Sequence, residues 1–485
     1  MSEAPIFRPA IYVCGVFCSQ LAAAMLVPAA VDAIDRNPDW RTFTESAIIV
    51  GFLSVTAMLA TRSSSPKFTL RFAFFAVVLI WVVTAIAGAL PFWMSGRGMS
   101  FTDSVFESMS GITTTGSTVI IGLDEAPRGL LLWRSMLQWI GGIGFVAMGL
   151  LMLPFLRVGG MQFFRIESSD RSDKPFPRFL QFSTALVMLY FGLTVACGLG
   201  YVLAGMPVFE AVNHAMTTLS TGGFSTHDYS LGHYQSDAIL WVAVLFMVIG
   251  SLPFTLYIRA LFISRATSLT DPQIVLFLAL VAVIAASMAT WLSLETGRPF
   301  LSALTQTTFH VVSIITTTGY AAGDYTTWGH AAVGMFLMLT MVGGCAGSTA
   351  GGLKSYRLLV MFELLRSGLT RLLYPHGVLQ LRYGGRTLEP DILRSVNVFL
   401  TAFLFSLVAL TLGLAFTGVE LVTALTGAMT ALANVGPGLG REIGPAGNFA
   451  TLNEPAKWLL TVGMLLGRLE IMSVLVLFSP AFWRG

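Results

Sequence analysis

The stretch ITTTGST, residues 112–118, follows a short apolar segment at 101–111 that is too brief to cross a membrane. Related stretches return three times: STGGFST at 220–226, ITTTGY at 315–320 and ANVGPG at 433–438. Each of them comes after a short, half-apolar segment and lies between long apolar runs. One small turn repeated at long, regular intervals indicates an internally repeated architecture, so these four turns decide the fold.

The amino-acid composition is that of an integral membrane protein. Of the 485 residues, 55% are hydrophobic and 11% are charged, and the mean hydropathy is +0.76. In a soluble globular domain about a quarter of the residues are charged. Ten apolar runs have the length that a hydrocarbon core of roughly 30 Å demands, and each is a predicted transmembrane span. They are 10–31, 45–61, 72–94, 130–153, 179–204, 238–263, 273–294, 331–342 with its continuation to 366, 395–416 and 456–479.

The four cysteines, Cys14, Cys18, Cys197 and Cys345, all lie inside apolar runs. This placement fits neither a disulfide framework nor an exposed CxxC metal site. We expect the four to be packing residues.

The distribution of Lys and Arg predicts the orientation in the membrane. Of 28 basic residues, 19 lie in the two termini and in the connections on one side, eight lie in the opposite loops, and Arg468 lies inside a span. By the positive-inside rule the richer side is cytoplasmic, so both termini are cytoplasmic and the four turns enter from outside. The 19 residues are Arg8, Arg62, Lys67, Arg71, Arg157, Arg165, Arg171, Lys174, Arg178, Arg259, Arg265, Lys354, Arg357, Arg366, Arg371, Arg382, Arg386, Arg394 and Arg484.

Aligning the turns on their common glycine gives Gly116, Gly223, Gly319 and Gly436, which are 107, 96 and 117 residues apart. Each repeat is predicted to read span, short helix, turn, span. The expected organisation is two N-terminal spans in 1–67, repeat 1 in 68–156, a basic linker and repeat 2 in 157–264, repeat 3 in 265–366 with an intramembrane loop at 341–353, and a basic linker and repeat 4 in 367–485.

The short segments restrict the fold further. A segment such as 101–111 or 207–219 makes a helix of only about 17–20 Å, so the chain must stop midway and return. Irregular backbone at that depth is tolerated only if protein buries it or if it lines a water-filled cavity. Four re-entrant turns meet both conditions by converging on one axis. The predicted fold is therefore an all-α polytopic membrane protein with four linked repeats around a central ion pore.

Thr, Ser and Gly at the turns suit a cation. Glycine permits positive φ, which lets consecutive carbonyl groups face one direction, and Thr hydroxyls add further oxygen ligands. Rings of carbonyl oxygens replace the water around an alkali cation, and the short helices point their partially negative C-terminal ends at the centre. A monovalent ion is expected, because the turns contain no carboxylate, although Asp124, Glu125, Asp228 and Asp324 lie just beyond three of them. A single TTTG is more often a helix end or a packing site, whereas four at regular spacing favour a filter.

This pattern resembles the Trk/Ktr/HKT superfamily of potassium transporters, and most closely its bacterial Trk branch, over essentially all of 68–480. The two additional N-terminal spans are similar to the extra pair of that branch. The resemblance implies passage of potassium, with rubidium and some sodium, and no bound cofactor or enzyme activity. It also implies that the residues of the four turns bind the ion. These filter residues are Thr114, Thr115, Gly116, Thr221, Gly222, Gly223, Thr317, Thr318, Gly319, Asn434, Val435 and Gly436.

The turns depart from an ideal potassium filter. None reads TVGYG, and the fourth, which contains Asn434 and Pro437, has no threonine. We therefore expect fewer good ion sites and imperfect discrimination between potassium and sodium. Within the resembling superfamily, relatives with serine in place of the first glycine, here Gly116, tend to favour sodium.

A glycine-rich segment follows the third turn. A straight helix over 331–366 would be about 54 Å long, nearly twice the hydrocarbon core, so an interruption is expected. The resemblance implies a mobile gating loop beneath the filter, and close helix packing through small residues is the alternative. A phosphate-binding loop is not expected, because Leu353 separates the glycine from Lys354 and the sequence predicts no strand before it. The expected gate residues are Gly343, Gly344, Gly347, Ser348, Thr349, Gly351 and Gly352.

Arg468 is expected near the middle of the last span. A charge at that depth costs several kcal/mol unless it faces water or a partner. The resemblance implies an electrostatic barrier below the filter, and an ion pair between helices is the alternative. Glu470 is not the expected partner, because residues two apart on a helix do not face each other.

The remaining expectations concern partners and location. The resemblance implies a bacterial inner-membrane protein, a homodimer, and a cytosolic nucleotide-binding regulatory subunit of the TrkA type docked on the basic connections 157–178 and 354–394. Those connections also suit anionic lipid headgroups. No nucleic-acid partner is expected, and channel-like flux and coupling to protons or sodium both stay open.

Two other classes of protein compete with the pore. A secondary transporter of another small solute also uses broken helices, but predicts paired inverted repeats. An intramembrane enzyme would need a catalytic motif, and the sequence has neither GxSxG nor HExxH. His214 and His310, in the short helices before turns two and three, are expected to pack or cap, with an effect of pH on the pore as the alternative.

Overall fold

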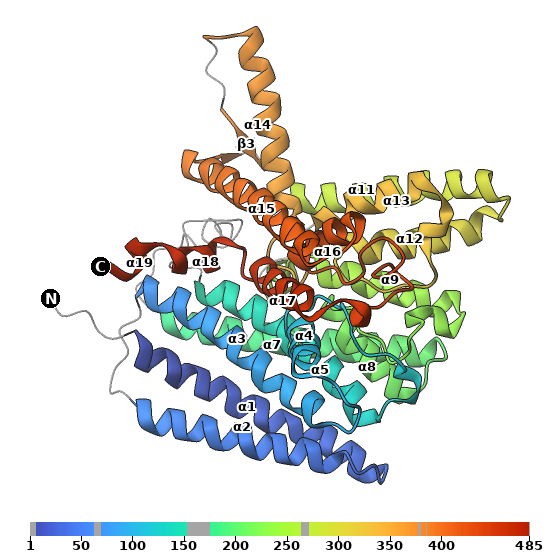
Figure 1. The fold of residues 1–485 in the computed structure, drawn as a ribbon. Helices are drawn as coiled ribbons and strands as arrows, with labels where there is room; N and C mark the ends of the chain where they lie inside the picture. The colour runs from blue at the N-terminus through green and yellow to red at the C-terminus, as the bar shows by residue number, and fades with distance from the viewer. Residues whose placement is uncertain are drawn as a thin grey trace.

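The computed structural model describes residues 6–62, 69–152, 175–262, 271–376, 380–384 and 386–484. The described chain is predominantly helical, which confirms the all-α prediction (Figure 1). Two small strand pairs were not predicted: β1 (Val342–Gly343) lies parallel to β2 (Leu353–Lys354), and β3 (Arg382–Tyr383) lies antiparallel to β4 (Arg386–Thr387). Each is two residues long, too short for a pattern of alternating side chains to signal it.

The helices occur in a repeating order of long, short and long. They are α1 Phe7–Ile34, α2 Trp40–Thr61, α3 Leu70–Met94, α4 Phe101–Ile112, α5 Arg128–Met152, α7 Pro175–Leu203, α8 Val208–Leu219, α9 Asp237–Ser251, α10 Phe254–Phe262, α11 Pro272–Thr296, α12 Phe300–Ile315, α13 His330–Met341, α14 Ser355–Leu373, α15 Pro390–Phe416, α16 Leu421–Ala433, α17 Glu454–Arg468, α18 Met472–Leu475 and α19 Pro480–Arg484. Short 3₁₀ turns lie between them: η1 Leu123–Glu125, η2 Ser230–Tyr234, η3 Tyr325–Trp328, η4 Phe449–Thr451 and η5 Val476–Phe478.

Six helices of the described chain, α1, α2, α3, α7, α11 and α15, are long and apolar enough to cross a membrane by themselves. Large apolar side chains stay exposed on them; Phe52 of α2 is 70% exposed and Phe405 of α15 is 73% exposed. An apolar outer surface of this kind is what a lipid environment requires.

Two predicted spans are broken in ways that the sequence analysis missed. The span 238–263 ends at Ser251 and resumes at Phe254, because Pro253 has no N–H to donate and keeps Leu252 in an extended conformation. The span 456–479 ends at Arg468, and the following helical segment turns by 105°. Glu470 and Ile471 have positive φ at that bend. Arg468 therefore ends a helix and does not lie in the middle of a span.

The expected interruption of 331–366 is present. Helix α13 ends at Met341, helix α14 begins at Ser355, and the residues between them form β1, a loop and β2. In Figure 1, α14 continues away from the rest of the bundle together with the β3–β4 hairpin.

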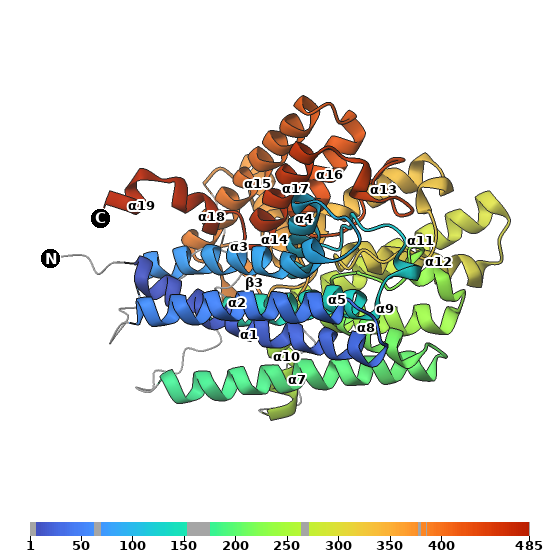
Figure 2. The same cartoon turned by 60° about the horizontal axis from the view of Figure 1, so that its bottom comes forward.

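The short helices α4, α8, α12 and α16 form the centre of the bundle. Each packs against the long helix before it, in the pairs α3–α4, α7–α8, α11–α12 and α15–α16. Each also packs against the helix that ends the preceding repeat, in the pairs α5–α8, α9–α12, α13–α16 and α17–α4. The last of these pairs, α17–α4, joins the fourth repeat to the first, so the four short helices are held in a ring (Figures 1 and 2).

The starts of the short helices have clear local causes. Ser100 accepts the Asp103 N–H at 3.1 Å and donates to its carboxylate at 2.9 Å, which caps α4. Pro207 and Pro299 stand at the N-caps of α8 and α12, where a missing N–H costs nothing. All four cysteines are buried and free, as the packing prediction expects.

Helices α1 and α2 form a hairpin beside the ring, and a buried carboxylate attaches it. Helix α1 packs against α2, α3 and α5. The buried Asp32, at the end of α1, accepts the Gly129 N–H at 2.7 Å in the first turn of α5. A carboxylate at a helix N-terminus is favoured by both the free N–H groups and the helix dipole.

Asp32→Ala should destabilise the folded protein by about 1.5–3 kcal/mol, the range for a hydrogen bond to a charged group. The matched control is Asp35→Ala, because Asp35 makes only a partly exposed contact with Arg128 at 3.5 Å and should change stability little. Thermal unfolding in detergent measures both variants. Equal midpoints for the two variants would contradict the attachment role of Asp32.

Candidate functional site

The four turns have one backbone conformation. The residue two positions before each aligned glycine has a left-handed φ of 53–59°, and these residues are Thr114, Thr221, Thr317 and Asn434. The glycines themselves have φ values of 87°, 78°, 82° and 101°. Residues that carry a Cβ rarely adopt these positive φ values, whereas glycine adopts them freely. The backbone conformation therefore explains why each turn has a glycine at this position.

The turns also share their hydrogen bonds. The N–H just before each glycine donates to the carbonyl five residues back, from Thr115 to Ser110, Gly222 to Thr217, Thr318 to Ser313 and Val435 to Thr430, at 2.8–3.1 Å. This is the bond that ends a helix in a Schellman motif. The short helices α4, α8, α12 and α16 therefore all finish with their C-terminal ends directed at a turn.

The four turns lie against one another in sequence order. A Cβ on Gly116 would overlap the Gly222 carbonyl oxygen, and a Cβ on Gly223 would overlap the Thr318 carbonyl oxygen. In the same way Gly319 faces the Val435 carbonyl, and Gly436 faces that of Thr115 at 3.0 Å. The structure thus brings all twelve predicted filter residues together in a closed ring of backbone.

The ring presents neutral oxygen atoms and no carboxylate. The carbonyl groups of Thr115, Gly222, Thr318 and Val435 occupy equivalent positions, since each precedes an aligned glycine and faces the neighbouring turn, and that of Gly222 also accepts a side-chain hydrogen bond. Neutral oxygens at the negative ends of four helices suit a weakly hydrated monovalent cation. Most Thr hydroxyls of the turns, those of Thr115, Thr221, Thr317 and Thr318, are engaged within the protein, for example Thr318 with Thr316 at 2.8 Å, so they are less available to an ion.

The fourth turn replaces threonine by an asparagine that ties the ring together. The Asn434 amide donates to the Thr115 hydroxyl at 2.9 Å and to the Met464 carbonyl at 3.0 Å. It therefore joins turn 4 to turn 1 and to α17. Asn434, which departs from the threonine pattern of the other turns, therefore supplies hydrogen bonds that hold the ring together.

A buried ion pair behind the ring escaped the sequence analysis. Glu107 of α4 and Arg134 of α5 are at most 1% exposed and lie 2.8 Å apart. Glu107 accepts from the Thr118 hydroxyl and the Val119 N–H, and Arg134 donates to the Ser225 carbonyl at 2.7 Å. The pair therefore fixes the chain just beyond turns 1 and 2.

Gln138, one turn further along α5, clamps the second turn itself. Its amide donates to the Gly222 carbonyl at 2.6 Å and accepts the Phe224 N–H at 3.0 Å. No local motif marks Glu107, Arg134 or Gln138; the only signal is that each is a polar residue in an apolar, helical stretch.

The loop between β1 and β2 lies directly beneath the ring. Thr349 donates to the Gly250 carbonyl at 2.9 Å and lies 3.1 Å from the Leu219 carbonyl, and Gly351 N–H donates to the Thr317 hydroxyl at 2.7 Å. A Cβ on Gly351 would overlap the Ala433 carbonyl. The loop thus contacts the ends of α8, α12 and α16 together.

Arg468 is buried and touches this loop. Its guanidinium donates to the Thr349 carbonyl at 2.8 Å, lies 3.4 Å from the Gly141 carbonyl, and stacks over Phe145 at 4.2 Å. Within the described part of the chain it makes no ion pair, so the helix-to-helix ion pair considered from the sequence is absent there. Glu470 is not its ion-pair partner, as expected, although the helix ends at Arg468 and Glu470 pairs with Arg357 instead.

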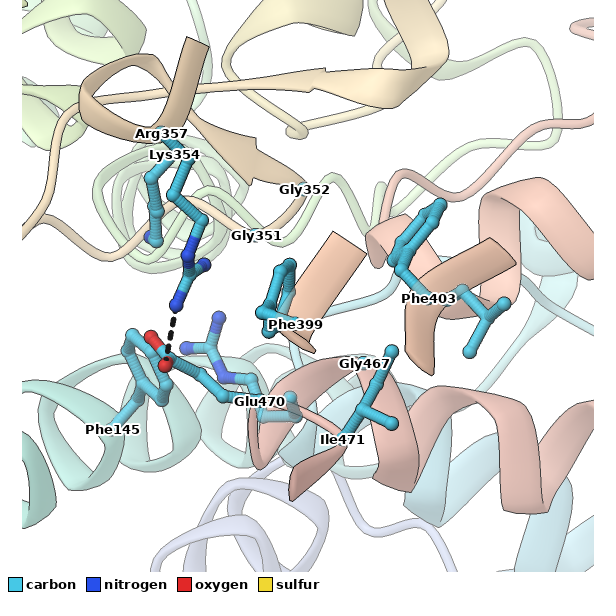
Figure 3. A pocket seen from close by; sticks show the side chains of 12 residues that line it. Phe145, Gly351, Gly352, Lys354, Arg357, Phe399, Phe403, Gly467, Glu470 and Ile471 are labelled. Carbon is cyan, nitrogen blue, oxygen red and sulfur yellow. Dashed lines mark hydrogen bonds and ion pairs between the residues drawn. The ribbon is translucent and has the colours of Figure 1, made fainter. Parts of the chain in front are cut away.

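Figure 3 shows a small cavity at this place, lined by Phe145, Lys354, Arg357, Phe399, Arg468 and Glu470 among others. Arg357 donates to Glu470 at 2.7 Å and stacks on Phe399 at 3.7 Å. Lys354 donates to the Ala350 carbonyl within the loop. Three cations and one carboxylate therefore surround the lower side of the ring.

Four of the basic residues that the orientation argument counted as loop residues are buried inside the protein. Lys354 and Arg357 were assigned to a cytoplasmic connection, and Arg134 and Lys457 to outer loops, yet all four are buried. Lys457 pairs with Asp103 at 2.6 Å. Most of the basic stretch 157–178 lies outside the described residues, as do Lys67 and Arg265.

The two histidines of the short helices have structural contacts. His214 bonds to the Glu210 carbonyl at 2.9 Å and to the Ser225 hydroxyl at 3.0 Å. His310 bonds to the Gln306 carbonyl at 2.8 Å and accepts the Ala322 N–H at 3.2 Å. Both side chains are fully buried, so they pack and cap as predicted.

Comparison with known proteins gives one consistent result. Residues 41–484 match the TrkH family, described as cation transport proteins. The chain is 45% identical to the Trk system potassium uptake protein TrkI of Halomonas elongata over 479 residues, covering 99% of this chain and 97% of the relative. It is 36% identical to the Trk system potassium uptake protein TrkH of Escherichia coli K12 over 487 residues, covering 99% of each. The crystal structure of the potassium transporter TrkH from Vibrio parahaemolyticus superposes with a TM-score of 0.91 at 34% identity, covering 99% of this chain and 100% of that one.

Arg134→Met should destabilise the protein by about 3–5 kcal/mol, because it leaves the Glu107 carboxylate buried without its partner. Adding Glu107→Gln to that variant should recover part of the loss, since the uncompensated charge is gone. Arg298→Met, at an exposed position between α11 and α12, is the control for losing a cation. The measurement is the unfolding midpoint in detergent, and a double variant no more stable than Arg134→Met would contradict the assigned charge balance.

Proposed function

We propose, because the chain belongs to the TrkH family of cation transport proteins, that it takes up potassium across the bacterial inner membrane as the membrane subunit of a Trk system. The observation that carries the proposal is the closed ring of four turns, whose backbone oxygens replace the hydration shell of an alkali cation. The names of the relatives support potassium as the cargo. The protein acts as a transporter and not as an enzyme.

In this proposal the twelve ring residues form the filter. Potassium enters from outside, exchanges water for the carbonyl oxygens, and is held by the negative ends of α4, α8, α12 and α16. Rubidium passes in the same way. Because most of the Thr hydroxyls are bound within the protein and the fourth turn has no threonine, few complete rings of oxygen are available, and some sodium passes as well.

The loop 342–354 acts as the gate in this proposal, with Gly343, Gly344, Gly347, Ser348, Thr349, Gly351 and Gly352 giving it small side chains and conformational freedom. Its support is its position, in contact with three of the four short helices beneath the ring. Arg468 holds the loop by the Thr349 carbonyl and adds a positive charge below the filter. Opening requires the loop to leave these contacts.

The two termini and the connections after α2, α5, α10 and α14 face the cytoplasm in this proposal. A cytosolic nucleotide-binding subunit of the TrkA type is the expected partner on that side, and a second copy of the chain is expected to complete a homodimer. The projecting helix α14 supports a docking role, because Leu365, Leu369 and Leu372 are 61%, 56% and 79% exposed. Exposed leucines on a projecting helix are typical of an interaction surface.

The first test is rescue of a potassium-uptake-deficient bacterium together with rubidium flux into proteoliposomes. Gly223→Ala should lower flux by more than tenfold, because a Cβ there overlaps the Thr318 carbonyl at a φ of 78°. Gly436→Ala should cause the smallest loss of the four, since its Cβ meets the Thr115 carbonyl at 3.0 Å. Gly205→Ala controls for backbone strain, because Gly205 has a φ of 98° and open space around it.

The same assay tests selectivity and the competing class of protein. Gly116→Ser must displace the Gly222 carbonyl, so sodium should compete with rubidium more strongly than in the wild type. If the wild type carries no alkali cation, with or without a candidate regulatory subunit, a secondary transporter of another small solute replaces this proposal.

Arg468→Gln should raise the basal rubidium flux, by about tenfold if the charge contributes about 1.4 kcal/mol to the barrier. It removes the contact with Thr349 as well as the charge, and both changes favour passage. Arg441→Gln, at an exposed outer position, is the matched loss of a cation and should leave the flux unchanged. An unchanged or lower flux in folded Arg468→Gln would show that Arg468 neither holds the gate nor opposes the ion.

A further inference from the structure

We propose that Asp124, His227 and His233 form a binding site for a transition-metal dication, with Zn²⁺ as the preferred ion, on the outer side of the ring. Their ligand atoms all lie within 4.8 Å of one another. Two imidazoles and one carboxylate are a common donor set for zinc, and oxygen-preferring ions such as Mg²⁺ and Ca²⁺ suit it poorly. The family resemblance and the proposed potassium uptake assign no role to these three residues.

The site joins the loops that follow two different turns. Asp124 belongs to η1, eight residues after Gly116, whereas His227 follows Gly223 by four residues and His233 belongs to η2. The Asp124 carboxylate oxygen lies 2.5 Å from His227 Nδ1 and 4.0 Å from His233 Nδ1. Both rings thus direct the same nitrogen at one carboxylate.

The two imidazole rings lie together over the same carboxylate. The rings of His227 and His233 are stacked with centroids 3.6 Å apart at 4°. Imidazole binds a metal in its neutral form, so metal binding at this site would release any proton that the rings carry. The buried Nε2 of His227 has no hydrogen-bond partner, and Glu210 lies 3.5 Å from it.

The geometry requires only small movements to hold zinc. Donor atoms around tetrahedral zinc are about 3.3 Å apart when the metal–ligand bonds are about 2.0 Å. The contact between Asp124 and His227 must widen, and His233 must tilt and approach. The side chains of Asp124 and His233 are each 47% exposed, so they are free to make these shifts, and water has access to a fourth position.

The loops that carry the ligands are otherwise fixed, which makes the site a partly preformed one. The Asp228 carboxylate accepts the N–H groups of Gly122 and Leu123 at 3.1 Å, which holds the two loops together. The His227 N–H donates to the Ser225 hydroxyl at 3.1 Å, and the Ser225 carbonyl is held by Arg134. A metal bound by His227 is therefore connected through His227 and Ser225 to the filter turn at Gly223.

A consequence for transport rests on the proposed function. Metal binding would cross-link the loops beyond turns 1 and 2 and add positive charge on the outer side, where potassium approaches. Both effects oppose cation uptake. Micromolar extracellular Zn²⁺ should therefore slow rubidium uptake.

Binding is tested first and does not depend on transport. Tag-free protein in detergent, cleared of metal with a chelator, is titrated with Zn²⁺ by calorimetry and with Co²⁺ by visible absorption. The wild type should bind one ion per chain, and His227→Ala, His233→Ala and Asp124→Asn should each weaken binding at least tenfold. His330→Ala, which removes an exposed histidine outside the cluster, should bind as the wild type does.

Three results would overturn the proposal or its consequence. Wild-type affinity in folded His233→Ala, or loss of binding in His330→Ala, overturns the site. Zn²⁺ binding with equal rubidium flux in wild type and His233→Ala overturns the effect on uptake and leaves the site supported. If no alkali cation is carried at all, the proposed function fails, and the calorimetry still decides whether the metal site exists.

Discussion

Backbone that leaves a helix in the middle of a membrane must find its hydrogen-bond partners inside the protein. Here four such segments satisfy that requirement together. The helix-ending bonds engage the N–H groups of Thr115, Gly222, Thr318 and Val435, while the carbonyl groups of the same four residues are directed at the neighbouring turn. No single turn would be stable alone at this depth, so the ring depends on all four being present.

The rest of the bundle keeps the four turns at contact distance. The helix after a turn presents a glycine to the carbonyl four residues before the aligned glycine: Gly141 faces Ile112, Gly250 faces Leu219, and Gly467 faces Leu432. A larger side chain at any of them would push the helix away from the ring. Small residues at close helix contacts are the usual device in membranes, where apolar side chains alone give no preference for protein over lipid. The pair Glu107–Arg134 and the amides of Gln138 and Asn434 then fix the register between repeats.

The sequence predicted what is local or repeated. The glycines at the turns, the short helices and the interruption after Met341 all follow from length, composition and the four-fold recurrence of one pattern. The break at Pro253 had a local signal that was overlooked within a long apolar run. The bend after Arg468 has none, since Leu469, Glu470 and Ile471 are ordinary helix residues that tertiary contacts force out of the helix. Contacts such as Glu107 with Arg134, or Arg357 with Glu470, join residues 27 and 113 positions apart, and a single sequence carries no record of such pairs.

The loop below the ring lies among buried cations that outnumber the acidic groups beside them. Lys354, Arg357 and Arg468 are all buried near one carboxylate, Glu470, and burying an uncompensated charge costs several kcal/mol. The structure offsets this cost with carbonyl groups and aromatic faces: Thr349 and Phe145 for Arg468, and Phe399 for Arg357. A carbonyl is a weaker partner for a guanidinium than a carboxylate is. In the proposed gating role, movement of the loop breaks a hydrogen bond between Arg468 and a carbonyl group rather than an ion pair, which lowers the cost of opening relative to a gate closed by a salt bridge.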